Sequence, residues 1–524
     1  MQLKSKTWKL RKKMDQELIK FCMEKGLLLD KESYSLLGGF GLDIAKTIIE
    51  KISFLDQKII TKEFIEKNAF RISEAIGDER ITQALKIKLN LSLEINIEEK
   101  NHEPIKTLEL GNLKIIQSYA NLSKKLEPSD FVKYFRNRYG ELKKILQERK
   151  ELENLSSINK INGNRQAVSI IGIVYAKRIT KNKNILLEVE DLTGSINVLI
   201  NKDKEVYGVA KEILVDDIIG VKGFGNREIL FASAVVYPDA FIDEKRFLDR
   251  NESVAFISDI HLGSNNFLES GFLKFIEWIN GNIGDDKQKQ EALRVKYLLV
   301  TGDSVDGVGI FPGQEEVLLI KDMREQYRAL ANLLSKIRKD VKIIIAPGQH
   351  DAVRVAEPQP AIGKDYAQPL HDLENVILVS NPAMIEISNT SSRGIKILMY
   401  HGASMHHYVS EIERLRLGKA HDFPAKIVKE LLKRRHLASM HSAVVYIPTE
   451  KQDSLAILEV PDIITTADLH KPEVEMYNNI LIVCSSCWQS TTPFEEKVGN
   501  HPDPCKVPVV NLKTREVKIL DFSE

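Results

Sequence analysis

Residues able to bind metal ions follow five short apolar runs in the second half of the sequence. Apolar runs of this length, bounded by turn residues, predict buried β-strands. In α/β proteins the carboxyl ends of such strands deliver side chains to one edge of a sheet, where ligand sites form. The runs and the residues after them are Val254–Ser258 with Asp259 and His261, Tyr297–Thr301 with Asp303, Lys342–Ala346 with Gln349 and His350, Lys396–Tyr400 with His401, and Asp462–Thr466 with Asp468 and His470.

The residue types in this series indicate a centre of two divalent metal ions. Two such ions about 3.5–4 Å apart can clamp a phosphodiester and share a hydroxide. A bridging carboxylate must touch both ions, and Asp303, in the middle of the series, is the natural choice. Mixed imidazole and oxygen ligands suit Mn, Fe or Zn and argue against an all-oxygen Mg or Ca site. Of the 12 histidines only His102 lies in the first 250 residues, so the chemistry is expected in the second half.

Bulk composition limits the classes of protein to consider. A length of 524 residues predicts two to four domains. The net charge of +1 gives no overall attraction to nucleic acid, so a DNA-binding surface would have to be a local patch. Four cysteines are too few for a disulfide scaffold and suit a reducing cytoplasm. Because no apolar run reaches 18 residues and no signal peptide is recognisable, we expect a cytoplasmic protein without membrane contact.

The first 165 residues are expected to form two regions. Residues 1–75 have apolar residues at helical spacing over Asp15–Lys25 and Leu42–Ile52, which predicts a helical domain used for partner contact or, alternatively, for DNA binding. Residues 76–165 are rich in charges of both signs and lack a sustained strand pattern. This composition predicts a charged linker that includes one or two helices.

Residues 166–240, unlike the charged region before them, contain short β-like runs. Five runs in some 70 residues, separated by Lys, Asn, Asp and Gly, predict a small β-barrel of the OB type. Such barrels bind single strands through aromatic stacking and basic grooves. Few aromatic residues are available here, with Tyr175 the best candidate, so both DNA contact and a structural or subunit-facing role remain open. The runs are Val168–Tyr175, Ile185–Glu190, Ser195–Ile200, Ile218–Phe224 and Ile229–Val236.

An α/β domain is expected over residues 251–524, with helices at Phe267–Ile279 and Glu315–Ile337 between the strands. Three further groups of residues in this domain carry weaker signals. Cys484 and Cys487 form a lone CxxC pair that fits packed thiols better than a zinc site. His406 and His407, just after His401, fit surface histidines, with contact to a phosphate as the alternative. The run Lys433–Arg435 fits either a DNA-backbone contact or a solvated helix face.

The motifs of this domain resemble those of the calcineurin-like metallophosphoesterases, and more closely those of the small subunits of archaeal family D DNA polymerase. The resemblance covers residues 166–524. It rests on FISDIHLGS, LLVTGDSVDGVGIFPGQ, APGQHDAVR with the following AEPQP, and YHGAS. It implies a calcineurin-like β-sandwich flanked by helices, preceded by an OB-like barrel and an N-terminal helical region.

The resemblance also implies a function and roles for individual residues. It implies a 3′–5′ proofreading exonuclease that acts on single-stranded DNA 3′ ends by a two-metal mechanism, with Mn the expected metal and Fe, Zn or Mg as alternatives, and that pairs with a large polymerase subunit. One metal would be held by Asp259, His261, Asp303 and His470, and the other by Asp303, Gln349, His401 and Asp468. His350 would act as the catalytic imidazole at the leaving oxygen.

Two positions depart from the pattern of that family. The family usually has Asn at the position of Gln349, and Gly-His-x-His where this chain has Ala467–His470 with Asp468. Gln349 reaches one methylene farther, and Asp468 replaces a neutral ligand by an anionic one, which leaves the metal a weaker Lewis acid. A non-catalytic scaffold subunit with a degenerate site is therefore the alternative, and an unrelated phosphatase or nucleotidase is a third interpretation.

Overall fold

The structure is a computed structural model, and the residues it describes fall into two compact units, Met1–Asn101 and His102–Glu524, each considered by itself. In the first unit, residues 17–24 and α3 (Leu42–Ile52) are helical, and β1 (Leu28–Leu29) pairs in parallel with β2 (Ile59–Ile60). Ile48 and Ile52 of α3 pack with Leu18 in a small core, as expected from their spacing. The described residues are 17–30, 33–34, 37, 42–52, 59–61, 64–65, 108–120, 125–389, 393–449, 452–498 and 500–523.

The second unit is built on two mixed β-sheets. The first sheet has the order β13-β12-β11-β10-β19-β20 and the second the order β17-β18-β16-β15-β14-β4-β3. The strands of the first sheet are β10 (Ser253–Ile257), β11 (Val295–Thr301), β12 (Lys342–Ala346), β13 (Val376–Leu378), β19 (Lys506–Asn511) and β20 (Val517–Asp521). Those of the second are β3 (Leu108–Leu110), β4 (Leu113–Gln117), β14 (Ala383–Ile387), β15 (Ile395–Met399), β16 (Ile463–Thr466), β17 (Glu473–Tyr477) and β18 (Ile480–Cys484).

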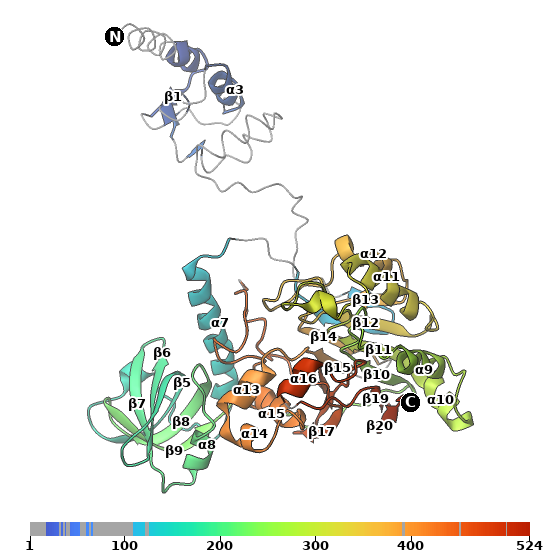
Figure 1. Cartoon of the computed structure of the whole chain (residues 1–524). Coiled ribbons are helices and arrows are strands. Elements are labelled where there is room, and N and C mark those ends of the chain that lie inside the picture. Colours follow the sequence, from blue (N-terminus) through green and yellow to red (C-terminus); the bar gives the residue numbers. More distant parts are fainter. Residues whose placement is uncertain are drawn as a thin grey trace. The chain divides into compact units, whose positions relative to one another are not determined.

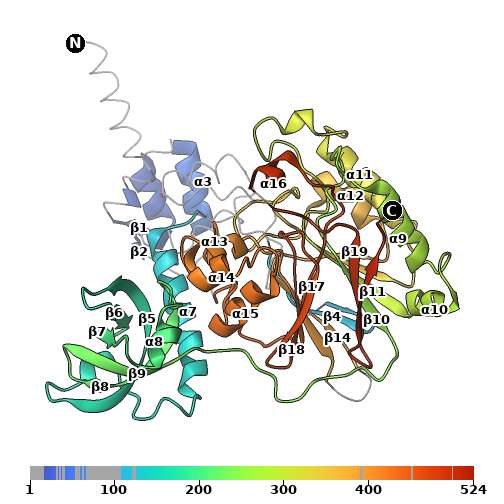
Figure 2. The same cartoon turned by 60° about the horizontal axis from the view of Figure 1, so that its bottom comes forward.

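The two sheets pack face to face, and helices cover their outer faces. In β10, Val254 and Phe256 face the core between the sheets, whereas Ala255 and Ile257 face the helices, so both faces of the strand are buried. This explains why the strand is a continuous apolar run. These helices form two groups. The first is α9 (Glu269–Ile279), α10 (Asp286–Arg294), α11 (Met323–Leu334) and α12 (Lys364–His371), and the second is α13 (Met405–Glu411), α14 (Glu413–Leu417) and α15 (Ala425–Arg434). Figures 1 and 2 show the first group on one side of the sheets and the second on the other.

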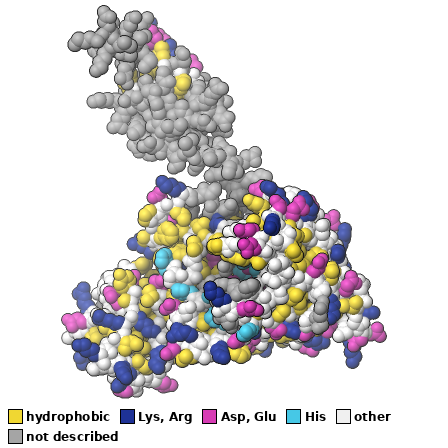
Figure 3. Space-filling view, viewed as in Figure 1, with side chains coloured by type: hydrophobic (Ala, Val, Ile, Leu, Met, Phe, Trp, Pro, Cys, Tyr) yellow, Lys and Arg dark blue, Asp and Glu magenta, His cyan; other side chains and the backbone are white. Residues whose placement is uncertain are grey.

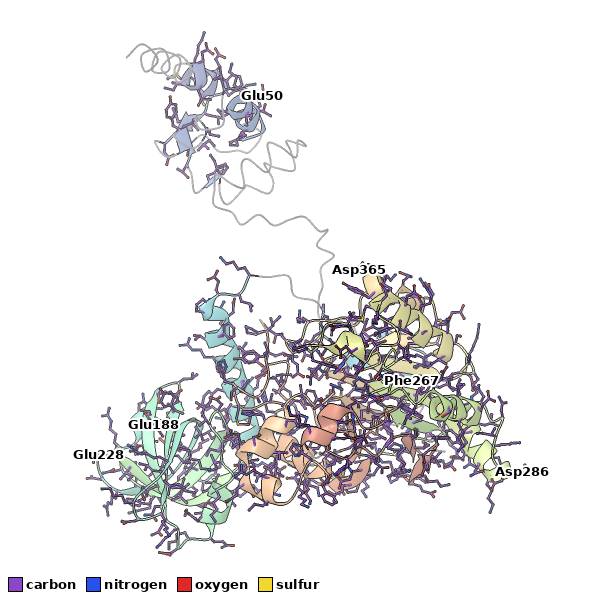
Figure 4. All side chains as sticks on the ribbon, viewed as in Figure 1. Glu50, Glu188, Glu228, Phe267, Asp286 and Asp365 are labelled. Carbon is purple, nitrogen blue, oxygen red and sulfur yellow. The ribbon has the colours of Figure 1, made fainter. Side chains whose placement is uncertain are left out.

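A closed five-stranded barrel precedes the sandwich, in the order β5-β6-β7-β9-β8. The sequence-based expectation of an α/β sandwich flanked by helices and preceded by a small barrel is thus confirmed. Glu188 and Glu228, labelled in Figure 4, are exposed on the barrel. The elements are β5 (Gln166–Ile179), β6 (Ile185–Asp191), β7 (Gly194–Ile200), α8 (Val206–Ala210), β8 (Ile218–Gly225) and β9 (Ile229–Val236).

Part of the segment expected to be a charged linker is instead built into the second unit. β4 pairs antiparallel with β14, so residues 113–117 extend the second sheet of the sandwich. α7 (Pro128–Gln147) then packs Tyr139, Leu142 and Leu146 against the barrel residues Ile171 and Ile218. The expectation of a linker over 76–165 is therefore wrong for 108–120 and 125–165, while residues 76–107 lie outside the described residues.

A buried cluster of polar residues ties α7 to the sandwich. Arg138 and Asp453 form an ion pair in which both side chains are at most 2% exposed. Tyr134 and His436 also bond to the Asp453 carboxylate, and Arg138 donates to the carbonyl of Ser439. Burial alone would raise the pKa of Asp453, but Arg138 and His436 outweigh burial and hold it well below its ordinary value. The cluster thus favours the folded state above the ordinary carboxyl pKa, and this contribution is lost as the pH falls toward the lowered pKa.

We predict that Arg138→Leu lowers the free energy of unfolding of the second unit by about 3–5 kcal/mol, because it leaves the Asp453 carboxylate buried without its cation. Urea unfolding followed by circular dichroism measures the change. Arg328→Leu is the matched control, since Arg328 pairs with Glu325 on the surface and is 57% exposed. An equal loss in both variants would contradict the prediction, since an exposed pair contributes about 0–1 kcal/mol.

The basic run Lys433–Arg435 joins the barrel to the sandwich. Arg434, which is 3% exposed, pairs with Asp217 of the barrel at 2.9 Å and also donates to the carbonyl of Glu212. Lys433 pairs with Glu212 at 3.1 Å. Buried Arg435 donates to the carbonyl of Ile457. The interpretations of this run as a DNA-backbone contact or a solvated face are wrong, because the structure uses it to fix the barrel.

Within the described residues, no helix has the length and apolar character that a membrane crossing requires.

Candidate metal centre

The predicted ligands at three of the strand ends have strained backbones. Gly302 precedes Asp303 and also has a positive φ. Residues other than glycine rarely adopt positive φ, and such strain persists where the surrounding fold imposes it, often at functional sites. The affected ligands are Asp259, His261, Asp303, Asp468 and His470, with φ of 47°, 49°, 48°, 69° and 56°.

The fold brings the predicted ligands together from both sheets. β10, β11 and β12 of the first sheet supply Asp259, His261, Asp303 and Gln349, and β15 and β16 of the second supply His401, Asp468 and His470. Candidate ligand atoms of Asp259, His261 and His470 lie within 4.8 Å of one another, as do those of Asp259, Asp303 and His401. The ligand series therefore converges where the two sheets meet.

The three predicted histidine ligands share one arrangement. The Nδ1 atom of His261 lies 3.1 Å from Asp306 Oδ1, that of His401 lies 2.9 Å from the carbonyl of Thr301, and that of His470 lies 2.8 Å from Glu495 Oε1. A partner at Nδ1 fixes the tautomer and leaves Nε2 free to bind a metal. Accordingly Nε2 faces a carboxylate in each case, at 3.9 Å (His261–Asp303), 3.3 Å (His401–Asp303) and 3.5 Å (His470–Asp259).

Several of these inward-facing atoms are buried without a hydrogen-bond partner among the described residues. They are Asp259 Oδ1, His261 Nε2, His401 Nε2 and Asp468 Oδ2. A buried polar atom without a partner is costly, and bound cations would satisfy these atoms. The donor set of imidazole nitrogens and carboxylate oxygens fits Mn, Fe or Zn. The residues present thus fit divalent metal ions.

Asp303 has the central position in this cluster. Its Oδ2 faces His401 and His261, and its Oδ1 accepts a hydrogen bond of 2.8 Å from the backbone N–H of His350. Burial alone would raise the pKa of Asp303, but His401, His350 and His261 lower it far below its ordinary value. Gly348 is required beside it, because a Cβ at this position would lie 2.2 Å from Asp303 Oδ1.

Gln349 and Asp468, the two departures from the family pattern, contact each other. The amide Nε2 of Gln349 lies 3.3 Å from Asp468 Oδ1, and the same oxygen lies 3.8 Å from His401 Nε2. Burial alone would raise the pKa of Asp468, but His406 and His401 lower it, so the carboxylate is anionic. A metal ion would bind the amide oxygen, so Gln349 would need the opposite amide orientation to act as a ligand.

His350, the predicted catalytic residue, lies beside the cluster. Its Nδ1 is 2.7 Å from the carbonyl of Asp306, and its ring meets that of His261 edge-on, with 4.7 Å between centroids. A carbonyl can only accept a hydrogen bond, so Nδ1 carries a proton. Burial alone would lower the pKa of His350, but Asp303 and Asp306 outweigh it and raise the pKa.

Three residues outside the predicted set support the site. Asp306 holds His261 and, through its carbonyl, His350. Glu495, in α16 (Pro493–Val498), holds His470. Asp351 accepts hydrogen bonds from the backbone N–H groups of Ser304 and Gly348, and burial raises its pKa to about 6. Asp306 could have been found from the sequence, since it ends the GD-x-x-D motif; Glu495 has no such signal.

Comparison with known proteins identifies the family of this chain. A family model for the B subunits of DNA polymerases alpha and epsilon matches residues 254–475. The DNA polymerase II small subunit of Archaeoglobus fulgidus is 34% identical over 93% of this chain and 97% of its own length. That of Methanothermobacter thermautotrophicus is 38% identical over 76% of this chain and 80% of its own. The chain belongs to the family of archaeal DNA polymerase II small subunits. The resemblance seen in the sequence motifs is thereby confirmed.

The match to longer members of the family is partial. The DNA polymerase II small subunit of Pyrococcus furiosus is 40% identical over 78% of this chain, but the match spans only 64% of that relative. Among solved structures, one described as a novel archaeal phosphodiesterase aligns with 51% of this chain and 98% of its own, with a TM-score of 0.26 and 12% identity. A likeness this weak supports no argument about function.

Proposed function

We propose that this chain is a 3′–5′ exonuclease that hydrolyses phosphodiester bonds at single-stranded DNA 3′ ends and proofreads for a large polymerase subunit. The observation that carries the proposal is the shared arrangement of His261, His401 and His470. Each has its Nδ1 held by an oxygen and its Nε2 directed at a buried carboxylate. Structural histidines have no reason to repeat this arrangement three times around one point.

The ligand set divides into two groups that share Asp303. Asp259, His261 and His470 with Asp303 would hold one divalent cation, and Gln349, His401 and Asp468 with Asp303 would hold the other. Manganese is the expected ion, with Fe, Zn or Mg as alternatives. When bound, such a pair of ions activates water and neutralises charge on the phosphate.

The remaining roles belong to residues of the chain. His350, with its raised pKa, is placed to donate a proton to the leaving 3′ oxygen, while Asp306 fixes its ring. Asp351 holds the loop that carries His350 through its bond to the backbone of Gly348. The partner would be a large polymerase subunit, as the family name implies, and the barrel is available to contact either that subunit or DNA.

The test is release of nucleotides from a labelled single-stranded 3′ end in the presence of Mn²⁺. The purified chain is assayed alone and with its large subunit, against a substrate whose 3′-terminal linkage is a non-hydrolysable analogue. We expect mononucleotides from the normal 3′ end, and none from the analogue or in excess chelator. Absence of Mn²⁺-dependent cleavage in both preparations would contradict the proposal.

The contact between Gln349 and Asp468 favours a second candidate, a non-catalytic scaffold subunit. Their hydrogen bond satisfies polar groups at the second cation's position without a metal. Restoring the family residues with Gln349→Asn and Asp468→His distinguishes the two functions. If the doubly substituted chain cuts DNA where the natural chain does not, the natural site is degenerate and the scaffold function is correct.

A further inference from the structure

His406, a residue outside the predicted ligand set, lies at the edge of the metal centre. It is in α13, which begins four residues after His401. Its Nε2 is 3.3 Å from Asp468 Oδ2, whereas Gln349 and His401 face the other oxygen of this carboxylate, Oδ1. The side chain of His406 is 57% exposed, whereas that of Asp468 is 13% exposed, so His406 lies at the rim and Asp468 deeper. Figure 3 shows histidine side chains reaching the surface between the barrel and the sandwich.

A further histidine, His421, contacts the Nδ1 atom of His406. His406 Nδ1 lies 3.2 Å from Nε2 of His421, and the two ring centroids are 5.2 Å apart. His406 therefore repeats the arrangement of His261, His401 and His470, with Nδ1 partnered and Nε2 directed at a carboxylate of the site. When Nδ1–H donates to His421, the lone pair of Nε2 is free to bind a metal.

The contact between His406 and Asp468 is more than a surface ion pair. Although the two atoms are 3.3 Å apart, Asp468 Oδ2 is buried and has no well-aligned hydrogen bond among the described residues. At this distance the two atoms could also serve as two ligands of one cation. The pair also joins a carboxylate oxygen to an imidazole nitrogen, a combination that suits Mn, Fe or Zn.

We infer that His406 is an additional imidazole ligand of the cation held by Asp468, and that His421 positions it. This inference rests on the proposed two-cation site. On this inference, His406 of α13 supplies the imidazole that the family usually has at position 468, where this chain has Asp.

The test measures Mn²⁺ binding to the full chain by the EPR signal of free Mn²⁺. The wild-type chain is expected to bind two ions. His406→Ala should weaken one of them by more than about 100-fold and leave the other unchanged, and His421→Ala should weaken the same ion by about 10–100-fold, as typical for outer-shell partners. His407→Ala is the matched control, because His407 is next in α13 but its Nε2 faces Ser442, 3.2 Å away.

Two further measurements separate a ligand from a positioning residue. In the chain labelled with ¹⁵N-histidine, the nitrogen couplings of bound Mn²⁺ should show one imidazole fewer in His406→Ala. Combining His406→Asp with Asp468→His exchanges the two ligand types and should restore binding to within about 10-fold of wild type. Unchanged affinity in His406→Ala, or weakened binding with the same number of nitrogen couplings, would overturn the inference. A wild-type chain that binds no Mn²⁺ would overturn the proposed function as well.

Discussion

Asp303→Ala is expected to remove both cations and all nuclease activity. Its carboxylate is shared between the two proposed ligand groups, and its Oδ2 lies 3.3 Å and 3.9 Å from the Nε2 atoms of His401 and His261. Without it, neither group keeps its central anion, and the imidazoles lose their common partner. Elemental analysis of the dialysed protein counts the ions, and circular dichroism checks that the fold is retained.

The control is Asp340→Ala, which removes a carboxylate that is 53% exposed and pairs with Lys296. It should leave the metal content and the rate of cleavage unchanged. If Asp303→Ala retained two ions per chain, Asp303 would not bridge the centre, and Asp259, which lies near both His470 and His401, would be the next candidate.

His350→Ala is expected to reduce the rate of cleavage by about 10²–10⁴-fold while both cations remain bound. Expulsion of a 3′ oxygen without protonation is slow because its pKa is high. His350 is not among the proposed ligands, so metal content and DNA affinity should change little. Single-turnover kinetics measure the chemical step separately from binding.

The dependence of the cleavage rate on pH distinguishes a proton donor from a histidine that only supports the structure. Because His350 is proposed to donate a proton, the wild-type rate should fall as the pH rises through the raised pKa of His350. His350→Ala should lose this alkaline limb. If the variant instead lost stability with the alkaline limb intact, His350 would only support its loop.

The strands that supply the proposed ligands were predictable because each is buried on both faces and ends at the site. The predicted run Lys342–Ala346 coincides with β12, and the others differ from the observed strands by one or two residues at their ends. What the sequence could not show is that these strands belong to two sheets. Strand order depends on contacts between distant segments, whereas periodicity reports only the local burial of each strand.

The supporting residues of the site were missed for a related reason. Glu495 lies 25 residues after His470, in a helix whose sequence has no metal-site signature. Likewise Arg138 is separated from Asp453 by 315 residues. The sequence around Arg138 therefore predicts a charged, solvent-exposed segment and does not indicate its buried partner. His406 fits a surface histidine in the sequence for the same reason. Charged and imidazole side chains show their role only through partners brought in by tertiary structure.

The pairing of β4 with β14 has a practical consequence for recombinant fragments. A fragment that starts at residue 251 would retain the complete proposed ligand set, yet it would leave β14 as an open edge, with unpaired backbone groups ready to pair with a strand of another copy. It would also leave Asp453 without Arg138. A self-contained fragment that carries the proposed metal centre should therefore start near residue 102, and must include the barrel.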